Sequence, residues 1–251
     1  MLQAILFDVD GTMADTERDG HRVAFNLAFH EAGLDWHWDV PTYGELLAVT
    51  GGKERIRYFI DHYAPTVPAV ADLTAWTAGL HKAKTAHYLE LLRRGEIPLR
   101  PGVARLIAEA RQAGMRLAIT TTTTPENVTG LLKATLGEES PEWFELIAAG
   151  DIVPAKKPAP DIYHHTLEQM NLAPAETIAL EAAANGVRSA RAADVPVVVT
   201  VNDYTAGDDF DGALAVLTHL GDPGTPAETL TGAAPDDGVV DLGYLRGLID
   251  R

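Results

Sequence analysis

A short apolar strand that ends in two carboxylates constrains this chain more than any other feature. The run Ala4–Phe7 is too short and too rich in strand-forming residues for a helix, so it predicts a buried strand. Asp8 and Asp10 follow it at once, and Gly11 and Thr12 complete a turn. Unpaired buried carboxylates are costly, but the cost is tolerable where a hard cation and a phosphate bind. The strand end therefore predicts a site that binds a hard cation and a phosphate group.

The spacing of the two carboxylates sets a geometric condition on that site. Asp8 and Asp10 alternate with Val9, so both reach one point only if the chain bends after Asp8, and Gly11 permits such a bend. Asp8 can then serve as a nucleophile and metal ligand, with Asp10 as general acid and base. The alternative is an Asp-rich turn that only caps a loop. The position of Asp-x-Asp-Gly-Thr directly after an N-terminal apolar strand favours the catalytic interpretation.

Composition restricts the partners. The 251 residues are 46% hydrophobic and carry a net charge of -16, from 36 acidic and 20 basic side chains. This balance opposes nucleic acid and anionic membranes, and an anionic substrate would need a local cluster of Lys, Arg and metal. The chain has no cysteine, and its first apolar run is too short to cross a bilayer. With no basic segment before that run, we expect a protein of the cytoplasm. A monomer is also expected.

Short apolar runs alternate with helical patterns over most of the chain, which predicts an α/β fold with a parallel sheet. The expected strands are Ala4–Phe7, 116–121, 146–149, 177–180 and Val197–Thr200. The expected helices of this part are 103–113, 127–136, Asp161–Met170 and 185–193. Gly114 is expected to be the residue that ends the first of these helices.

One segment breaks the alternation. Residues 16–92 contain apolar helical segments such as 23–27 and 56–60 and no convincing strand, and 94–102 reads as a return linker. We therefore expect an α/β core formed by residues 1–15 and 96–251. Residues 16–95 would form an all-helical cap, inserted after the first strand. The tail from 221 to 251, with a strand remnant and helix over 239–249, has no functional interpretation.

A run of hydroxyl side chains follows the second strand. Thr120 to Thr124 lie there, and Pro125, Glu126 and Asn127 open a helix. Hydroxyl groups beside the free N–H groups of a helix N-terminus can hold an anion. The alternative is a β-branched strand end with an ordinary helix cap.

A stiff loop carries a pair of lysines. In Lys156-Lys157-Pro158-Ala159-Pro160-Asp161 the prolines restrict the backbone, so one lysine can point inward as a fixed positive charge. Lys157, directly before Pro158, is the candidate, whereas Lys156 is expected to be solvated. Asp161 is a candidate cap for the next helix.

Cations also occur at the start of a helix in the predicted cap. Lys53 and Arg55 follow a Gly-Gly pair, although the dipole of a helix N-terminus favours acidic groups. This favours an anionic partner over the alternative of solvated charges. Most histidines are expected on the surface or in packing, apart from His21 near the motif turn, and Trp36 and Trp38 are expected to pack within the cap.

These motifs, in this order, resemble those of the haloacid dehalogenase-like (HAD) hydrolases, most of which are Mg2+-dependent phosphotransferases. The resemblance implies a Rossmann-like core with a helical cap. It implies that Asp8 forms an aspartyl-phosphate, and that Asp10 protonates the leaving oxygen and then activates water. Thr121, with the Thr122 backbone beside it, and Lys157 would bind the transferring phosphoryl group.

The fourth motif departs from the family pattern Glu-Asp-Ser-x-x-Gly. This chain reads Glu181-Ala182-Ala183-Ala184-Asn185-Gly186, so alanines replace the expected metal-binding Asp and the Ser. Asp8, the Asp10 carbonyl and Glu181, with water and substrate phosphate, remain as Mg2+ ligands. Weaker Mg2+ binding and impaired turnover are then expected. Deliberate inactivation and natural drift are both open as the origin of the change.

Further segments resemble the CbbY-type branch of the family, sugar-phosphate phosphatases associated with the Calvin cycle. These segments are Asp15-Thr16-Glu17, His21, the Lys53 to Arg55 run, Asp35-Trp36, Trp38-Asp39, Arg100-Pro101-Gly102, Tyr204 and Asp209-Phe210. The resemblance implies that Thr16, Glu17, His21, Lys53 and Arg55 bind substrate, with xylulose 1,5-bisphosphate as the leading candidate. The alternatives are a phosphomutase like β-phosphoglucomutase, a substrate-binding pseudoenzyme, or an engineered inactive variant.

Overall fold

The computed structural model describes residues 1–249, and the chain in it forms two compact units. The first consists of Met1–Asp15 together with the segment from Pro98 onward, and the second is Thr16–Ile97. Each unit is described by itself. The first unit contains the sheet, and the second is entirely helical.

The elements of the first unit alternate between strand and helix along the chain. Its strands are β1 (Ala4–Phe7), β2 (Arg116–Thr120), β3 (Leu146–Ala148), β4 (Thr177–Glu181), β5 (Val197–Thr200), β6 (Ala215–Leu217) and β7 (Thr229–Gly232). Its α-helices are α5 (Val103–Gln112), α6 (Pro125–Leu136), α7 (Asp161–Met170), α8 (Ala184–Ala192) and α9 (Leu242–Ile249). Short 3-10 turns lie at Ser140–Trp143, Pro174–Glu176 and Asp236–Gly238.

The strands form one sheet of order β3-β2-β1-β4-β5-β6-β7. All neighbouring pairs are parallel except β6 and β7, which are antiparallel. The expected α/β class and the expected strands from β1 to β5 are confirmed, with ends that shift by one residue in β2, β3 and β4. The strand remnant expected within 239–249 is wrong, because residues 239–241 form no strand and only the helix α9 lies in that segment. Two strands were not expected: β6 is only three residues long, and β7 is polar and largely exposed at the sheet edge, so neither has a clear apolar pattern.

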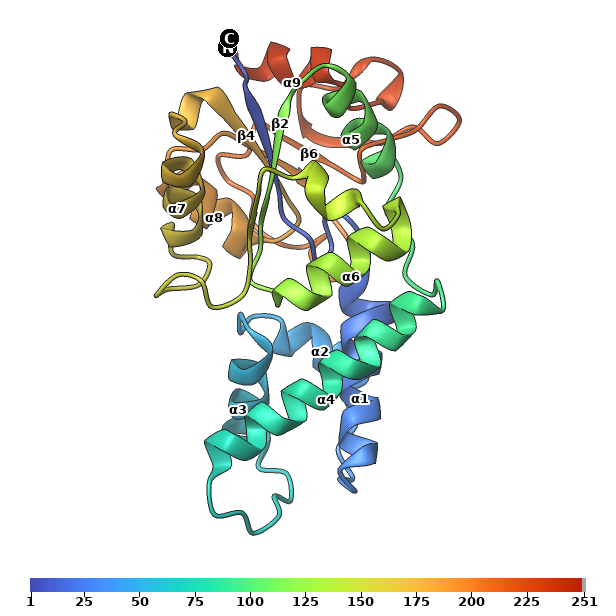
Figure 1. Cartoon of the computed structure of the whole chain (residues 1–251), viewed down its shortest axis with the longest axis vertical. Coiled ribbons are helices and arrows are strands. Elements are labelled where there is room, and N and C mark those ends of the chain that lie inside the picture. Colours follow the sequence, from blue (N-terminus) through green and yellow to red (C-terminus); the bar gives the residue numbers. More distant parts are fainter. Residues whose placement is uncertain (250–251) are drawn as a thin grey trace. The chain divides into compact units, whose positions relative to one another are not determined.

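Helices cover both faces of the sheet. Figure 1 shows α7 and α8 on one side of it and α5, α6 and α9 on the other. Every residue of β1 is buried, because a parallel sheet is enclosed by its crossover helices. Leu6 belongs to the same buried cluster as Ile162 and Tyr163 of α7, and Phe7 packs edge-on against Phe144 with ring centroids 6.2 Å apart.

The register of the central strands decides where the polar motifs meet. Phe7 is paired with Ile119 of β2 and with Leu180 of β4. Since these strands are parallel, the residues after them gather at one edge of the sheet, where open α/β sheets bind their ligands. Asp8 and Glu181 therefore reach the same edge from neighbouring strands.

The second unit is built around a cluster of aromatic side chains. Its helices are α1 (Arg22–Glu31), α2 (Val40–Leu46), α3 (Gly52–Tyr63) and α4 (Leu73–Arg93), preceded by a π-helical turn at Glu17–His21. Trp38 is fully buried and lies 4.7 to 5.3 Å, between ring centroids, from Phe25, Phe29 and Phe59. Trp36 packs against Phe29 and Phe59, so the packing roles expected for both tryptophans are confirmed. Within residues 1–249, none of the helices combines the length and apolar character needed to cross a bilayer.

Two glycines with left-handed backbone differ in the space that a side chain would have in the first unit. Gly102 has φ +87°, and a Cβ there would lie 2.5 Å from the carbonyl oxygen of Gly221 and 2.6 Å from the carbonyl carbon of Leu220. Gly114 has φ +67°, which agrees with its expected place just after α5, but a Cβ there would meet open space.

We expect Gly114→Ala to lower the free energy of unfolding by about 1–2 kcal/mol, the cost of a left-handed L-residue. Gly102→Ala should lose about 1–3 kcal/mol more, because backbone atoms must also move apart. Urea unfolding of the two variants and the parent measures the difference. Equal losses would show that the segment at residues 220–221 moves aside without cost.

Candidate active site

Asp8 lies at the carboxyl end of β1 with both carboxylate oxygens engaged. Its backbone N–H donates to the carbonyl of Leu180 at 3.0 Å, which continues the β1–β4 ladder by one residue. Oδ1 accepts a hydrogen bond from Lys157 Nζ at 2.9 Å, and Oδ2 accepts one from Thr12 Oγ1 at 3.0 Å. The side chain is thus held in one orientation in a largely buried position.

The turn after Asp8 bends as the sequence predicts. Gly11 has φ +79°, and its N–H donates to the carbonyl of Ala14 at 2.8 Å. A Cβ at position 11 would lie 2.3 Å from Asn202 Nδ2, so glycine is required by backbone conformation and by space. A backbone bridge pairs Asp10 with Ala14, which fixes the backbone of Asp10 within the same turn.

Lys157 is the central cation of the site. Its side chain is 5% exposed, and Nζ donates to Asp8 Oδ1, to Glu181 Oε1 at 2.7 Å and to the carbonyl of Thr120 at 2.8 Å. An ammonium group has three hydrogens, and three acceptors from β1, β4 and the end of β2 receive them. The inward lysine expected from the Pro-rich loop is therefore found.

The buried charges shift one another's titration. Burial raises the pKa of Asp8, and Lys157 opposes the rise without cancelling it. Burial likewise raises the pKa of Glu181 to about 7, again against the attraction of Lys157. Burial alone would lower the pKa of Lys157, but the two carboxylates outweigh burial and leave that pKa above its ordinary value. The cluster thus raises the pKa of its lysine and the pKa of both of its carboxyl groups.

Glu181 is enclosed on both carboxylate oxygens. Oε1 accepts hydrogen bonds from Lys157 Nζ and from the hydroxyl of Tyr163. A Cβ at Gly186 would lie 1.9 Å from Oε2, so the first turn of α8 packs directly against this carboxylate. The Glu and Gly of the fourth motif thus form one contact, which explains why both are needed at this spacing.

Ala182 faces the catalytic turn. It is buried, and its Cβ would lie 3.6 Å from a Cβ placed on Gly11. A longer acidic side chain at 182 would therefore stand beside the turn that carries Asp10. The alanine contributes no oxygen at that place.

The donor set fits a Mg2+ ion poorly as it stands. Within the described part of the chain, no three acidic or histidine side chains converge where they could ligate a metal. Glu181 is enclosed by Lys157, Tyr163 and Gly186, and position 182 offers only a methyl group. Of the residues expected as ligands, Asp8 and the Asp10 carbonyl remain, which leaves one carboxylate, the lower end of the one or two that Mg2+ sites commonly use.

The hydroxyl run lies at the same sheet edge. Thr121 is buried directly after β2, and its Oγ1 accepts the N–H of Thr123 at 3.3 Å. Thr122 is half-buried, and α6 begins at Pro125 as expected, although Thr124 makes no side-chain cap. The helix N-terminus and the residues after β2 thus stand next to the strand that carries Asp8.

Two details of the lysine loop differ from expectation. Lys156 is not freely solvated: its side chain is 19% exposed and pairs with Asp151 at 3.0 Å. Asp161 does not cap α7, because Pro160 occupies the cap position and Asp161 is the first helical residue. Its Oδ2 accepts the N–H of Ala155 at 3.2 Å, so it closes the loop instead.

The helical unit contains a buried polar network of its own. Arg55 is 6% exposed, and its guanidinium donates to Tyr43 Oη at 2.7 Å and to the Leu46 carbonyl at 3.2 Å. Tyr43 donates to Glu17, whose carboxylate also pairs with Arg55 at 3.7 Å. The alternative of a solvated charge is wrong for Arg55, while Lys53 is half-buried at the start of α3.

A second pair in this unit joins His21 to Lys84. His21 Nδ1 lies 2.8 Å from Lys84 Nζ, and both side chains are buried. The ammonium also lies 5.1 and 5.3 Å from the ring centroids of Phe25 and Tyr88. Thr16, another expected substrate residue, is buried just before the π-helical turn.

Sequence reasoning missed several members of these networks. Thr12 is part of the first motif and Tyr163 follows Asp161 by two residues, so motif proximity could have indicated both. Tyr43 and Lys84 lie in ordinary helical patterns. Their partners are far away along the chain, so no local sequence pattern predicts these contacts.

Comparisons with known proteins identify the family of this chain. The family model described as haloacid dehalogenase-like hydrolase matches residues 2–194. The chain is 49% identical to protein CbbY of Cupriavidus necator over 225 residues, which cover 90% of this chain and 88% of that protein. It is 46% identical to protein CbbY of Cereibacter sphaeroides, over 89% of this chain and 95% of that protein.

Solved structures give the same result. The crystal structure of CbbY from Rhodobacter sphaeroides in complex with phosphate matches with a TM-score of 0.82 and 46% identity, over 87% of this chain and 95% of that one. A mutant of that CbbY in complex with xylulose-(1,5)-bisphosphate matches with a TM-score of 0.81, at the same identity and coverage. The chain belongs to the haloacid dehalogenase-like hydrolases. It is a phosphoric monoester hydrolase of that family.

The central cation makes a stability prediction. Lys157→Met leaves Asp8 and Glu181 buried beside each other without their cation, so we expect a loss of about 3–5 kcal/mol in unfolding free energy at pH 7–8. Lys156→Met removes a more exposed pair and should cost about 0–1 kcal/mol. Urea unfolding measures both, and a Lys157→Met loss as small as that of Lys156→Met would show that the cluster is not held by this charge.

The stability deficit of the same variant should depend on pH. The pKa of Glu181 in the fold, about 7, already lies above its ordinary value of 4.5, and loss of Lys157 raises it further. A carboxyl with a raised pKa binds its proton more tightly in the fold, so its destabilisation grows as pH rises from the unfolded to the folded pKa. Parent and variant share this dependence below about pH 7, so the deficit of Lys157→Met relative to the parent should shrink as the pH is lowered from about 8 to about 7. A deficit that is constant over this range would contradict the assignment.

Proposed function

We propose that this chain is a sugar bisphosphate phosphatase of the CbbY type, with xylulose 1,5-bisphosphate as the first substrate to test. The observation that carries the proposal is the orientation of Asp8. Its carboxylate is fixed by Lys157 and Thr12 at the end of β1, beside the turn that carries Asp10. The CbbY of Rhodobacter sphaeroides, bound in a mutant form to xylulose-(1,5)-bisphosphate, supports the choice of substrate.

In the proposed reaction an oxygen of Asp8 attacks the phosphorus of the substrate. The bond from phosphorus to the sugar oxygen breaks, and Asp10 gives that oxygen its proton. Asp10, now a carboxylate, then takes a proton from water, which attacks the aspartyl-phosphate and releases inorganic phosphate. Lys157 supplies positive charge for the phosphoryl oxygens, and Thr121 with the Thr122 N–H and the α6 N-terminus would bind them.

The second phosphate of the substrate would be bound by residues of the helical unit. We assign this role to Lys53 and Arg55, and we assign Thr16, Glu17 and His21 to the rest of the substrate. The buried network of Glu17, Tyr43 and Arg55 supports the assignment, because it holds a guanidinium in one orientation. Glu17 would accept a hydroxyl of the sugar rather than bind phosphate.

The fourth motif limits the proposed enzyme. Mg2+, on which HAD phosphatases generally depend, would neutralise the transferring phosphoryl group. Here Ala182 supplies no carboxylate beside the turn, and Glu181 is enclosed. We therefore propose weak Mg2+ binding with substrate binding retained, since Thr121 and Lys157 do not act through residue 182. We further propose that the protein is a cytoplasmic monomer.

The same geometry leaves two rivals, each with its own readout. A phosphomutase would pass the phosphoryl group to a second sugar hydroxyl, so it would convert a hexose 1-phosphate into its isomer without net phosphate release. A substrate-binding pseudoenzyme is favoured by Ala182 and would bind xylulose 1,5-bisphosphate without turnover. Parallel measurement of phosphate release, isomer formation and binding by calorimetry separates the three.

Asp8→Asn tests the nucleophile. An amide cannot attack phosphorus, so phosphate release should fall by about three orders of magnitude or more, as when other enzyme nucleophiles are removed. The circular dichroism spectrum should stay unchanged. Asp211→Asn, a change at an exposed acid, should leave release within about twofold of the parent. Release by Asp8→Asn at the parental rate would remove Asp8 from the mechanism.

Ala182→Asp tests the metal site. The added carboxylate would stand beside the catalytic turn, so Mg2+ affinity should rise by about 10–100-fold and kcat by about tenfold or more. Ala182→Asn adds a side chain of nearly the same size without the charge and should gain much less. Calorimetry with Mg2+ alone and phosphate release at saturating Mg2+ measure the two effects. Equal affinity in parent and Ala182→Asp would mean that the alanine is neutral.

A further inference from the structure

Arg100 is a buried cation for which sequence analysis gave no role beyond a resemblance. It follows directly after the backbone bridge between Leu99 and Ala14 and is 8% exposed. Its Nε lies 3.3 Å from Asp15 Oδ1, whose side chain is half-exposed. Burial lowers the pKa of Arg100, and Asp15 and Asp203 oppose the change. A guanidinium is buried at this cost only where its hydrogens find fixed acceptors.

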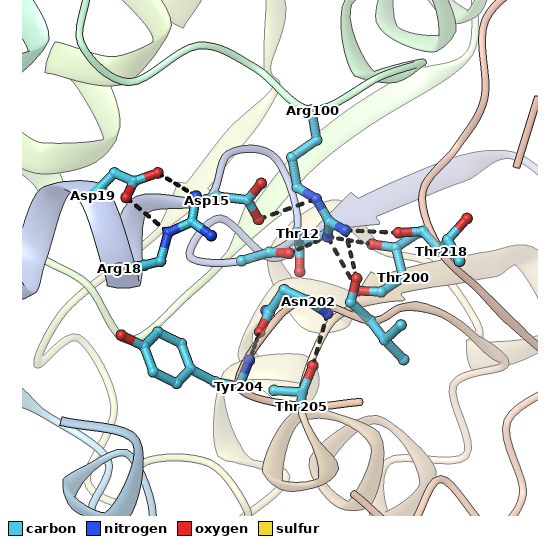
Figure 2. A network of polar contacts seen from close by, with 12 residues as sticks. Thr12, Asp15, Arg18, Asp19, Arg100, Thr200, Asn202, Tyr204, Thr205 and Thr218 are labelled. Carbon is cyan, nitrogen blue, oxygen red and sulfur yellow. Dashed lines mark hydrogen bonds and ion pairs between the residues drawn. The ribbon is translucent and has the colours of Figure 1, made fainter. Parts of the chain in front are cut away.

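Those acceptors are carbonyl groups from three separate segments, as Figure 2 shows in part. Nη1 donates to the carbonyls of Gly11 and, at 3.2 Å, Thr200. Nη2 donates to the carbonyls of Val201 and, at 2.7 Å, Thr218. The rigid fork of a guanidinium can join such segments, whereas a lysine has no comparable geometry. Arg100 thus ties the turn after β1 to the ends of β5 and β6.

The Gly11 carbonyl belongs to the turn that carries Asp10. On the other side of the same residue, the Gly11 N–H is held by Ala14, and Asn202 packs against its Cα. The Arg100 backbone adds a further tie, because its N–H donates to the carbonyl of Met13 at 2.8 Å. The turn is therefore held by several contacts, and the guanidinium of Arg100 provides the one to the Gly11 carbonyl.

We infer that Arg100 is a positioning residue that holds Asp10 where it can protonate the leaving oxygen and activate water. The role rests on the proposed phosphatase function, in which Asp10 is the acid and base. The guanidinium of Arg100 donates to main-chain carbonyls, so it would act on the reaction through the backbone of the turn. Small displacements of a catalytic group can cost about a hundredfold in rate. The inference therefore predicts an effect on kcat and little effect on substrate binding.

Arg105 offers a matched control. It is also an arginine that donates to three carbonyls, those of Leu220, Gly221 and Val240 at 2.8 to 3.3 Å, and it pairs with Asp222. These partners lie after β6 and before α9, away from the turn at residues 10–14 along the chain. Loss of Arg105 should therefore disturb the packing of these segments but leave Asp10 in place.

The experiment compares Arg100→Met, Arg100→Lys and Arg105→Met. For Arg100→Met we expect kcat to fall by about tenfold to a hundredfold, with KM and the Kd of inorganic phosphate within about threefold of the parent. Arg100→Lys should recover part of the loss. Arg105→Met should keep kcat within about twofold, even if its Tm falls as far as that of Arg100→Met.

Hydrogen exchange makes the test independent of turnover. The Gly11 and Met13 amides are hydrogen-bonded within the turn, so their exchange should speed up by about tenfold or more in Arg100→Met and not in Arg105→Met. If the parent releases no phosphate, the proposed function fails, and this arm still decides whether Arg100 orders the turn. Equal exchange in both variants, equal losses of kcat, or a rise in KM at constant kcat would overturn the inference.

Discussion

A single ammonium group balances the buried charges of the site. The Lys157 side chain is buried from solvent, and its Nζ donates hydrogen bonds to acceptors at the ends of three neighbouring strands. Asp8 can remain beside Glu181 in a closed environment only because this cation lies between them. The Pro-rich loop that presents Lys157, the hydroxyl that holds the other oxygen of Asp8 and the glycine that lets α8 approach Glu181 all serve the same arrangement. The side chains at the carboxyl ends of these strands are thus arranged around the charge of Lys157.

The same interaction explains why the fourth motif matters beyond its missing aspartate. Glu181 is used by Lys157 and Tyr163, so it is poorly placed to compensate for the methyl group of Ala182. Phosphate binding and metal binding would then depend on different groups of the same site. In the proposed function, phosphate would be bound by Lys157, Thr121 and a helix N-terminus, whereas a divalent cation would be bound by oxygens beside the turn at residues 10–14. A chain of this design can keep the first while it weakens the second.

The turn at residues 10–14 is held by groups that take no part in the proposed chemistry. Arg100 binds the Gly11 carbonyl, Ala14 binds the Gly11 amide, and Asn202 fills the space in which a side chain would otherwise lie. These contacts come from different parts of the chain and meet at a residue with left-handed backbone. Such support from outside the reacting groups is how a general acid and base keeps its place during a reaction.

Local pattern determined much of this protein. The strands from β1 to β5, the helices between them, the inserted helical segment and the motif residues Asp8 and Lys157 could be predicted, because apolar periodicity, turn residues and motif spacing are local properties. The short β6 and the polar edge strand β7 lack such a pattern and form only because the preceding strands offer a sheet edge. The enclosure of Glu181, the placement of Arg55 with Tyr43 and the bonds from Arg100 to Gly11 were decided by the tertiary structure. Each joins side chains and carbonyls that are separated along the chain, and burial makes their pairing obligatory only once the fold has brought them together.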